Sequence, residues 1–121
     1  MGRLNVLERL GSAEEEAEEI SPWWFDTEHA RAFVEGETDW DGSNDVYRTT
    51  GSQWDSESLW VTASCKYALH FTSRQQGVSE RVTELDVKQA VDWLIRNGTD
   101  VEEHVAKLPS EVLDEYRSRQ G

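Results

Sequence analysis

The sequence predicts an α+β fold, in which an antiparallel meander of three to four strands packs on helices. Three observations lead to this fold class. Leucines recur at helical spacing within residues 1–20, apolar and polar side chains alternate over much of 46–85, and the run 86–98 has a continuous apolar helical face. The predicted fold therefore has one or two N-terminal helices before the meander and two to three C-terminal helices after it.

The first twenty residues are expected to form an amphipathic, acidic segment that is partly disordered. An acidic run at 14–19, which cannot be buried, follows a Gly-Ser break in the helical pattern. A single α+β domain is expected to occupy 21–121, because 121 residues are enough for one small domain. The helical pattern itself depends on apolar side chains at spacing three, namely Leu4, Leu7 and Leu10.

A second N-terminal helix is predicted over 21–35. Ser21 is a good N-cap residue, Pro22 suits the first helical position, and Gly36 suits the end of the helix. The apolar residues at helical spacing are Ala30, Phe33 and Val34. The polar, glycine-containing stretch 36–45 is expected to be a loop.

Four strands are predicted in the following part of the chain. They are expected at 46–50, within 53–64, at 66–73 and at 79–85, where apolar residues recur at every second position. The last of these has one main apolar residue, Val82, so a loop is the alternative there.

A helix from Asp86 to Gly98 has the clearest pattern in the chain. Asp86 and Gln89 have the spacing of a capping box, and Asn97-Gly98 indicates a left-handed end. Two shorter helices are expected after it, one beginning at residue 99 or 100 and one following Pro109. The apolar positions of the Asp86–Gly98 helix are Val87, Ala90, Val91, Leu94 and Ile95.

The charge balance points to a protein of a concentrated-salt environment. The chain carries 25 Asp and Glu residues against 12 Lys and Arg residues, a formal net charge of -13. In molar salt the Debye length is about 3 Å, which screens this repulsion. We expect a halophilic protein whose acidic surface binds monovalent salt cations. Alternatively, the acidic residues are themselves the function, and the protein is a nucleic-acid mimic that inhibits a DNA- or RNA-binding partner.

Two segments resemble short uncharacterised proteins, many of them haloarchaeal and acidic. The segments are Val46–Trp54 and Ala90–Gly98. Their shared features are a Tyr-Arg-Thr strand, a turn between a glycine and a tryptophan, and a helix that ends in Trp-Leu-x-x-Asn-Gly. The resemblance implies a sheet followed by a helix in a salt-in halophile, and it implies no catalytic site.

Tryptophan is the residue type that most strongly suggests a function. The chain contains 6 Trp, and tryptophan is enriched at the energetic centres of protein interfaces. The sequence therefore predicts a small non-enzymatic protein-interaction module that binds a protein partner, or a second copy as a homodimer, through exposed aromatic residues. The expected contact residues are Trp23, Trp24, Phe25, Trp40 and Trp60.

Enzyme activity and cofactors are not expected. The sequence lacks a Gly-x-Ser-x-Gly turn and a glycine-rich phosphate loop. No metal site is expected either, since the three His lie in different predicted elements and Cys65 is the only cysteine. An acidic loop is a weak cation-binding candidate, although positions six and twelve of a calcium loop hold other residues there. Its carboxylates are Asp39, Asp41 and Asp45.

Two further expectations concern partners and location. The C-terminal helices give a third reading, a halophilic transcription regulator, but their acidic residues argue against nucleic-acid binding. No apolar stretch reaches the length of a transmembrane helix, and no signal peptide opens the chain. A cytoplasmic protein without membrane partners is therefore expected.

Overall fold

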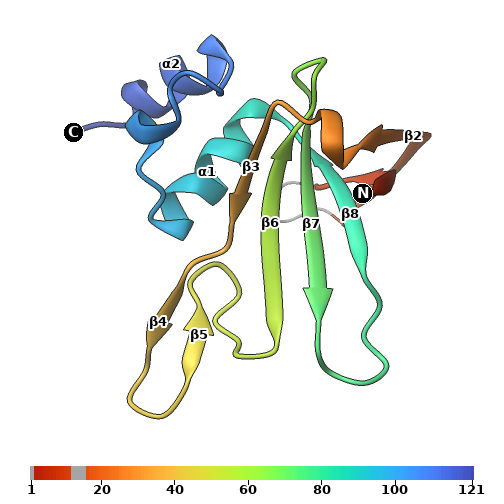
Figure 1. The fold of residues 1–121 in the computed structure, drawn as a ribbon, viewed down its shortest axis with the longest axis vertical. Coiled ribbons are helices and arrows are strands. Elements are labelled where there is room, and N and C mark those ends of the chain that lie inside the picture. The colour runs from red at the N-terminus through yellow and green to blue at the C-terminus, as the bar shows by residue number, and fades with distance from the viewer. Residues whose placement is uncertain (1, 12–15) are drawn as a thin grey trace.

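Six strands form one mixed sheet in the order β2-β1-β8-β7-β6-β3, and β4 and β5 form a separate hairpin. The computed structural model describes residues 2–11 and 16–121, which Figure 1 shows as a ribbon. The strands are β1 (Arg3–Arg9), β2 (Glu18–Asp26), β3 (Ala32–Glu35), β4 (Thr38–Trp40), β5 (Asp45–Tyr47), β6 (Asp55–Val61), β7 (Tyr67–Ser73) and β8 (Arg81–Leu85). The helices are η1 (Thr27–His29), α1 (Val87–Asn97), η2 (Val101–His104) and α2 (Ser110–Ser118).

The predicted α+β fold is wrong, because the described residues are mostly β-structure, with eight strands, and strands stand where the N-terminal α-helices were predicted. Within residues 1–20, the described residues include β1 and the start of β2, while residue 1 and residues 12–15 of that predicted segment lie outside the described residues. β1 shows the reason, because Val6 is fully buried whereas Asn5 and Leu7 on either side of it are exposed. This is the two-residue period of a strand. β1 pairs antiparallel with β2 and parallel with β8, which makes the sheet mixed.

The helix predicted over 21–35 is also wrong, because β2 and β3 occupy most of that segment. A strand sends successive side chains to opposite faces. Trp24 is 56% exposed and Phe25 only 7%. In β3, Ala32 and Val34 are buried while Phe33 between them is exposed. The apolar residues that suggested a helical stripe therefore alternate between two faces.

The central elements confirm the sequence pattern. β6, β7 and β8 lie in three of the predicted strand segments and pair antiparallel with one another. The Asp86 carboxylate accepts the Gln89 N–H, and the Gln89 side chain accepts the Asp86 N–H, so the capping box is confirmed. Gly98 ends α1 with a φ of 71°. The remaining predicted strand segment, 46–50, contains the end of β5, which pairs with β4 outside the main sheet.

The larger core lies between the sheet and the two α-helices. Leu59 of β6 and Leu85 of β8 pack with Trp93 and Leu94 of α1. Trp93 is fully buried, and its indole Nε1 donates to Glu57 Oε1 at 3.0 Å. None of the helices in the described ranges is long and apolar enough to cross a membrane.

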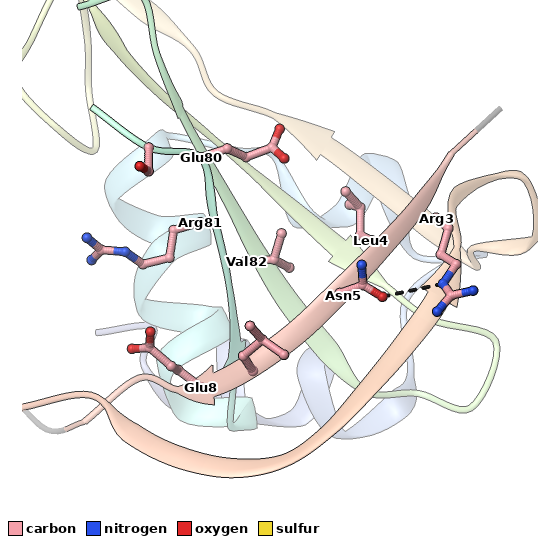
Figure 2. Close-up of a pocket in the computed structure, with 9 residues that line it drawn as sticks. Arg3, Leu4, Asn5, Glu8, Glu80, Arg81 and Val82 are labelled. Carbon is pink, nitrogen blue, oxygen red and sulfur yellow. Dashed lines mark hydrogen bonds between the residues drawn. The ribbon is translucent and has the colours of Figure 1, made fainter. Parts of the chain in front are cut away.

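A smaller core lies on the opposite face of the central strands. Val6 of β1, Phe25 of β2 and Ala68 of β7 are buried together, and Trp60 and Val82 pack against them. Figure 2 shows β1 running at an angle to β8 on this side of the sheet. The β1–β2 ribbon therefore folds back over the face that the helices leave uncovered.

The β4–β5 hairpin forms an arm that projects from the rest of the fold (Figure 1). Buried Asn97 at the end of α1 holds its root, because Oδ1 accepts the Glu37 N–H at 2.7 Å and Nδ2 donates to the Glu35 carbonyl at 3.2 Å. Arg48 adds a second link. Its guanidinium donates to the Asn97 carbonyl at 3.1 Å and to both Asp39 carboxylate oxygens at 2.8 and 2.9 Å.

Tyr67 makes the stability of the larger core sensitive to alkaline pH. Its hydroxyl donates to a Glu111 carboxylate oxygen. Burial raises the pKa of the Tyr67 phenol, and the hydrogen bond to Glu111 and its negative charge raise it further. Since the folded pKa lies above the unfolded value of about 10, the contribution is fully present below pH 10 and is lost as the pH rises above it.

We therefore expect the urea-unfolding free energy to fall as the pH rises from 10, and to fall less steeply in Tyr67→Phe. The comparison is made between pH 8 and the highest pH at which the parent chain still refolds. Tyr47→Phe, which removes a phenol outside this core, is the control. Equal slopes for Tyr67→Phe and the parent chain above pH 10 would show that Tyr67 does not cause the alkaline loss.

Candidate functional site

The ladder between β1 and β8 stops after two residue pairs, and a cleft opens beyond it. Glu8 pairs with Thr83 and Arg9 with Glu84. Before Glu8 the two strands diverge around a cleft of about 390 Å³ (Figure 2). This volume lies at the lower end of the range that ligand pockets occupy.

The cleft occupies the place where the parallel ladder would continue. The same register would bring Leu7 beside Val82 and Asn5 beside Glu80. All four residues line the cleft, and the β1 residues do not pair with the β8 residues there. A length of strand edge on each side is therefore left without a neighbouring strand across the cleft.

A bulge in the β1–β2 ribbon accounts for the divergence. Val6 pairs with Trp23 but Glu8 pairs with Glu19, so β2 uses more residues than β1 over this stretch. Pro22 lies within the extra length and has no N–H to donate to a ladder. Bulges bend the strand pair and increase its twist. The ribbon consequently turns away from β8 at the point where the cleft begins.

Apolar side chains line the inner part of the cleft and polar ones its rims. Leu4 and Val82 lie between the two strands in Figure 2 and pack against the smaller core. Glu80 lies on the β8 side, where its carboxylate contacts His70 Nε2 at 2.9 Å. Arg81 is exposed and has no side-chain partner within the described ranges. The cleft therefore offers an apolar surface between charged groups.

Three further side chains give the outer face of the β1–β2 ribbon an apolar character. Leu7 and Trp24 are 53% and 56% exposed, and they line a shallow hollow of about 260 Å³ together with Pro22. The Arg3 guanidinium lies over the Trp24 ring at 4.6 Å from its centroid, a cation–π contact. Since Leu7 and Arg3 also line the cleft, the hollow and the cleft form one continuous surface.

Three of the five predicted contact residues lie in or against the smaller core. The ring centroids of Trp23 and Phe25 are 6.0 Å apart, as are those of Phe25 and Trp60, and Phe33 continues the row 4.4 Å from Trp60. Trp23 Nε1 donates to the Glu84 carboxylate at 3.1 Å. Trp60 Nε1 is buried without an acceptor among the described residues. These rings serve packing first, with only part of their surface open.

The other two predicted residues are exposed but far apart in the fold. Trp24 belongs to the hollow on the β1–β2 ribbon, whereas Trp40 is 66% exposed at the end of β4 on the projecting arm. The structure therefore brings Trp24, but not Trp40, to the cleft.

The acidic loop at the tip of the arm is organised by its own turn. The Asp41 carboxylate accepts the backbone N–H groups of Asn44 and Ser43, which lowers the pKa of Asp41. Arg48 holds a second carboxylate of the loop. Within residues 2–11 and 16–121 no group of three His, Cys, Asp or Glu side chains could hold a metal ion. Cation binding by this loop stays a prediction for Asp39, Asp41 and Asp45.

Two exposed apolar residues, Leu7 and Phe33, lie in strands although the sequence pattern predicts helices there. The pattern assigns Leu7 to a helix within residues 1–20 and Phe33 to a helix over 21–35. Polar and apolar residues alternate over Arg3–Val6, and this was the signal that could have identified a strand. A strand reading places Leu7 on the face opposite Val6, which is where it lies.

The C-terminal helices offer few donors to a nucleic acid. Arg117 donates to Glu102 at 2.9 and 3.1 Å. Arg119 is bound to Asp92 and Glu115. Arg117 in the last turn of α2 and Arg119 at its C-cap are therefore both already paired with carboxylates.

Comparisons of the chain with protein-family models, with curated proteins and with solved structures find no match. The resemblance to acidic haloarchaeal proteins thus stays a prediction.

Proposed function

We propose that this protein is a cytoplasmic, non-enzymatic interaction module of a halophile, and that it binds a partner protein through the cleft and the outer face of the β1–β2 ribbon. The observation that carries the proposal is the gathering of Leu7, Pro22 and Trp24 on one exposed face beside the cleft. Contiguous exposed apolar side chains rimmed by polar residues mark interaction sites. The single free cysteine, Cys65, is compatible with a reducing compartment.

The charge of the cleft supports a protein partner. Its lining contains two arginines and two glutamates, so it has no formal net charge, whereas the whole chain has -13. Another acidic protein is repelled less by this surface than by the rest of the molecule. The charged lining residues are Arg3, Glu8, Glu80 and Arg81.

A peptide-binding experiment tests the proposal. Random linear peptides of about ten residues, the length of a long strand, are selected on the immobilised full chain in molar KCl. Their affinities are then measured for purified variants. Leu7→Asp and Trp24→Ala are each expected to weaken binding about tenfold or more, as the loss of a central interface residue does. Trp40→Ala, which removes an exposed tryptophan elsewhere, is the matched control and should bind like the parent chain.

The proposal fails if no peptide is selected, or if the selected peptides bind both surface variants as tightly as the parent chain. Light scattering of the parent chain alone shows whether the partner is a second copy. In that case Trp24→Ala should shift the dimer towards monomer, and a dimer that is insensitive to Leu7→Asp and Trp24→Ala would also contradict the proposal.

A second candidate function, an acidic mimic that blocks a basic partner, is favoured by the projecting arm. Exposed carboxylates surround Trp40 on it, including those of Glu37, Asp39, Asp41 and Asp45. Binding through these charges would weaken steeply as KCl rises, because salt screens exposed charges. Binding through the apolar surface of β1–β2 should persist in molar KCl. Measuring the binding affinity as a function of KCl concentration therefore separates the two functions.

A further inference from the structure

We infer that the partner enters the cleft as an added strand, an extended segment of polypeptide that pairs with the main chains of β1 and β8 together. The inference deepens the proposed function and rests on it. Addition of a strand to an open sheet edge is a recurring mode of peptide recognition, in which main-chain hydrogen bonds supply the affinity.

The main chain of β8 faces the cleft at alternate residues. The Glu84 carbonyl accepts the Leu10 N–H at 2.9 Å, so the Glu84 main chain is directed towards β1. Main-chain groups along a strand point alternately to its two sides. Val82 therefore presents its N–H to the same side, and Glu80 continues the series just before the first residue of β8. The β1–β8 ladder contains only the pairs at Glu8 and Arg9, so Val82 has no residue of β1 paired with it.

The opposite wall is also a strand edge. The Gly2 carbonyl accepts the Thr27 N–H at 2.8 Å, which directs the main chain of Gly2, and by alternation that of Leu4, towards β2. Arg3 and Asn5 consequently present their main-chain groups to the cleft. Two unpaired edges thus face each other, and an unpaired edge is a template for another strand.

The shape and chemistry of the cleft select an extended segment. The cleft is closed at Glu8, where β1 and β8 meet, and it widens towards Arg3 and Glu80 (Figure 2). A strand inserted there would continue the β1–β8 ladder on both sides. Because side chains alternate along a strand, one face of the segment meets Leu4 and Val82 while the other faces solvent. We therefore expect an apolar residue over that pair and no proline at the paired positions.

Main-chain pairing can be tested on a peptide selected as described above. The peptide is resynthesised with single N-methyl groups at successive positions, each of which removes one N–H donor. Insertion between two strands predicts that methylation weakens binding about threefold to tenfold at neighbouring positions of both parities, since alternate N–H groups bond to β1 and to β8. The amides of Asn5 and Val82 should exchange more slowly with solvent in the complex.

A substitution in the chain removes one cleft-facing donor. Glu80→Pro deletes the N–H at the rim without altering the residues that pair with β7, and Pro is tolerated at an edge or just before a strand. Glu80→Ala loses the same carboxylate and the contact with His70 but keeps the N–H, so it is the reference variant. Glu80→Pro is expected to bind about threefold to tenfold more weakly than Glu80→Ala. Thermal unfolding of both variants establishes that they fold.

The outcomes separate the inference from the proposed function. If a peptide binds, Trp24→Ala weakens it, and N-methylation and amide exchange at Val82 have no effect, the partner sits on the outer hollow only. The function then stands and strand addition is wrong. Sensitivity at positions of one parity alone would mean addition to a single edge and would also overturn insertion between two strands. If no peptide binds, both fail.

Discussion

Trp93→Ala is expected to lower the free energy of unfolding by about 3–5 kcal/mol, which is the cost of removing a large aromatic ring from a core. Trp93 of α1 has no exposed surface and belongs to the larger core. The substitution leaves a cavity and also removes the indole donor from the Glu57 carboxylate. Since small domains have a total stability of about 5–15 kcal/mol, the loss is a large part of it. Urea denaturation followed by circular dichroism measures the change.

Two further variants show which part of the side chain matters. Trp40→Ala removes an exposed ring and should change stability by about 0.5 kcal/mol or less. Trp93→Phe keeps most of the apolar volume but leaves Glu57 without its donor, so an intermediate loss is expected. A loss of less than about 1 kcal/mol in Trp93→Ala, well below the usual cost of about 3 kcal/mol, would show that Trp93 does not stabilise the larger core.

Asn97→Ala is expected to lower the free energy of unfolding by about 2–4 kcal/mol, because it leaves two part-buried main-chain groups without their partner, at a cost of about 1–3 kcal/mol each. Asn97 is fully buried and binds the Glu37 N–H and the Glu35 carbonyl at the root of the arm. It also donates to Thr99 Oγ1 at 2.8 Å. Beyond the global loss, amide exchange in the β4–β5 arm should rise more than in β6 and β7, since the arm loses its attachment.

Asn44→Ala is the matched control, because Asn44 is an exposed asparagine of the same arm. It should leave both stability and arm exchange near the parent values. Asn97→Asp is a sharper test. It keeps the acceptor for Glu37 but turns an oxygen towards the Glu35 carbonyl, so it too should be destabilised at neutral pH. Unchanged exchange in the arm of Asn97→Ala would show that Arg48 alone holds the root.

The central part of the fold could be predicted because its contacts are local in sequence. β6, β7 and β8 follow one another through short turns, and each pairs with the next. The capping box of Asp86 and Gln89 joins residues one helical turn apart. Alternation and capping patterns depend on residues that are close in sequence, so they predicted these strands and the start of α1 correctly.

The N-terminal ribbon could not be predicted in the same way. Three leucines at spacing three fit a helix, whereas the alternation typical of a strand covers only Arg3–Val6, and these local patterns do not decide between the two structures. The decision comes from tertiary pairing with β8, which lies far along the chain. Ser21-Pro22 misled for a related reason. The pair is typical of a helix start, whereas Pro22 lies in the irregular part of β2 opposite Leu7.

The candidate site was anticipated only through its composition. An excess of tryptophan predicted exposed rings, and Trp24 is one of them. The cleft itself depends on where a long-range ladder stops, and no local pattern encodes that. The sequence does not distinguish an aromatic ring in the smaller core from one on a binding surface. It therefore predicted contact residues that pack in or against the core, namely Trp23, Phe25 and Trp60.

The pairing of β1 with β8 also sets an order of events during synthesis. The Gln89 side chain donates to the Leu10 carbonyl, 79 positions away, so the first strand has to wait for the last before it is fixed. Contacts between residues so far apart in sequence form slowly. Until then the ribbon is an isolated two-stranded hairpin, which is marginally stable and exposes Val6 and Phe25. The exposed glutamates at the start of β2, Glu18 and Glu19, discourage aggregation of nascent chains over this interval, since charge on a strand edge opposes pairing with another chain.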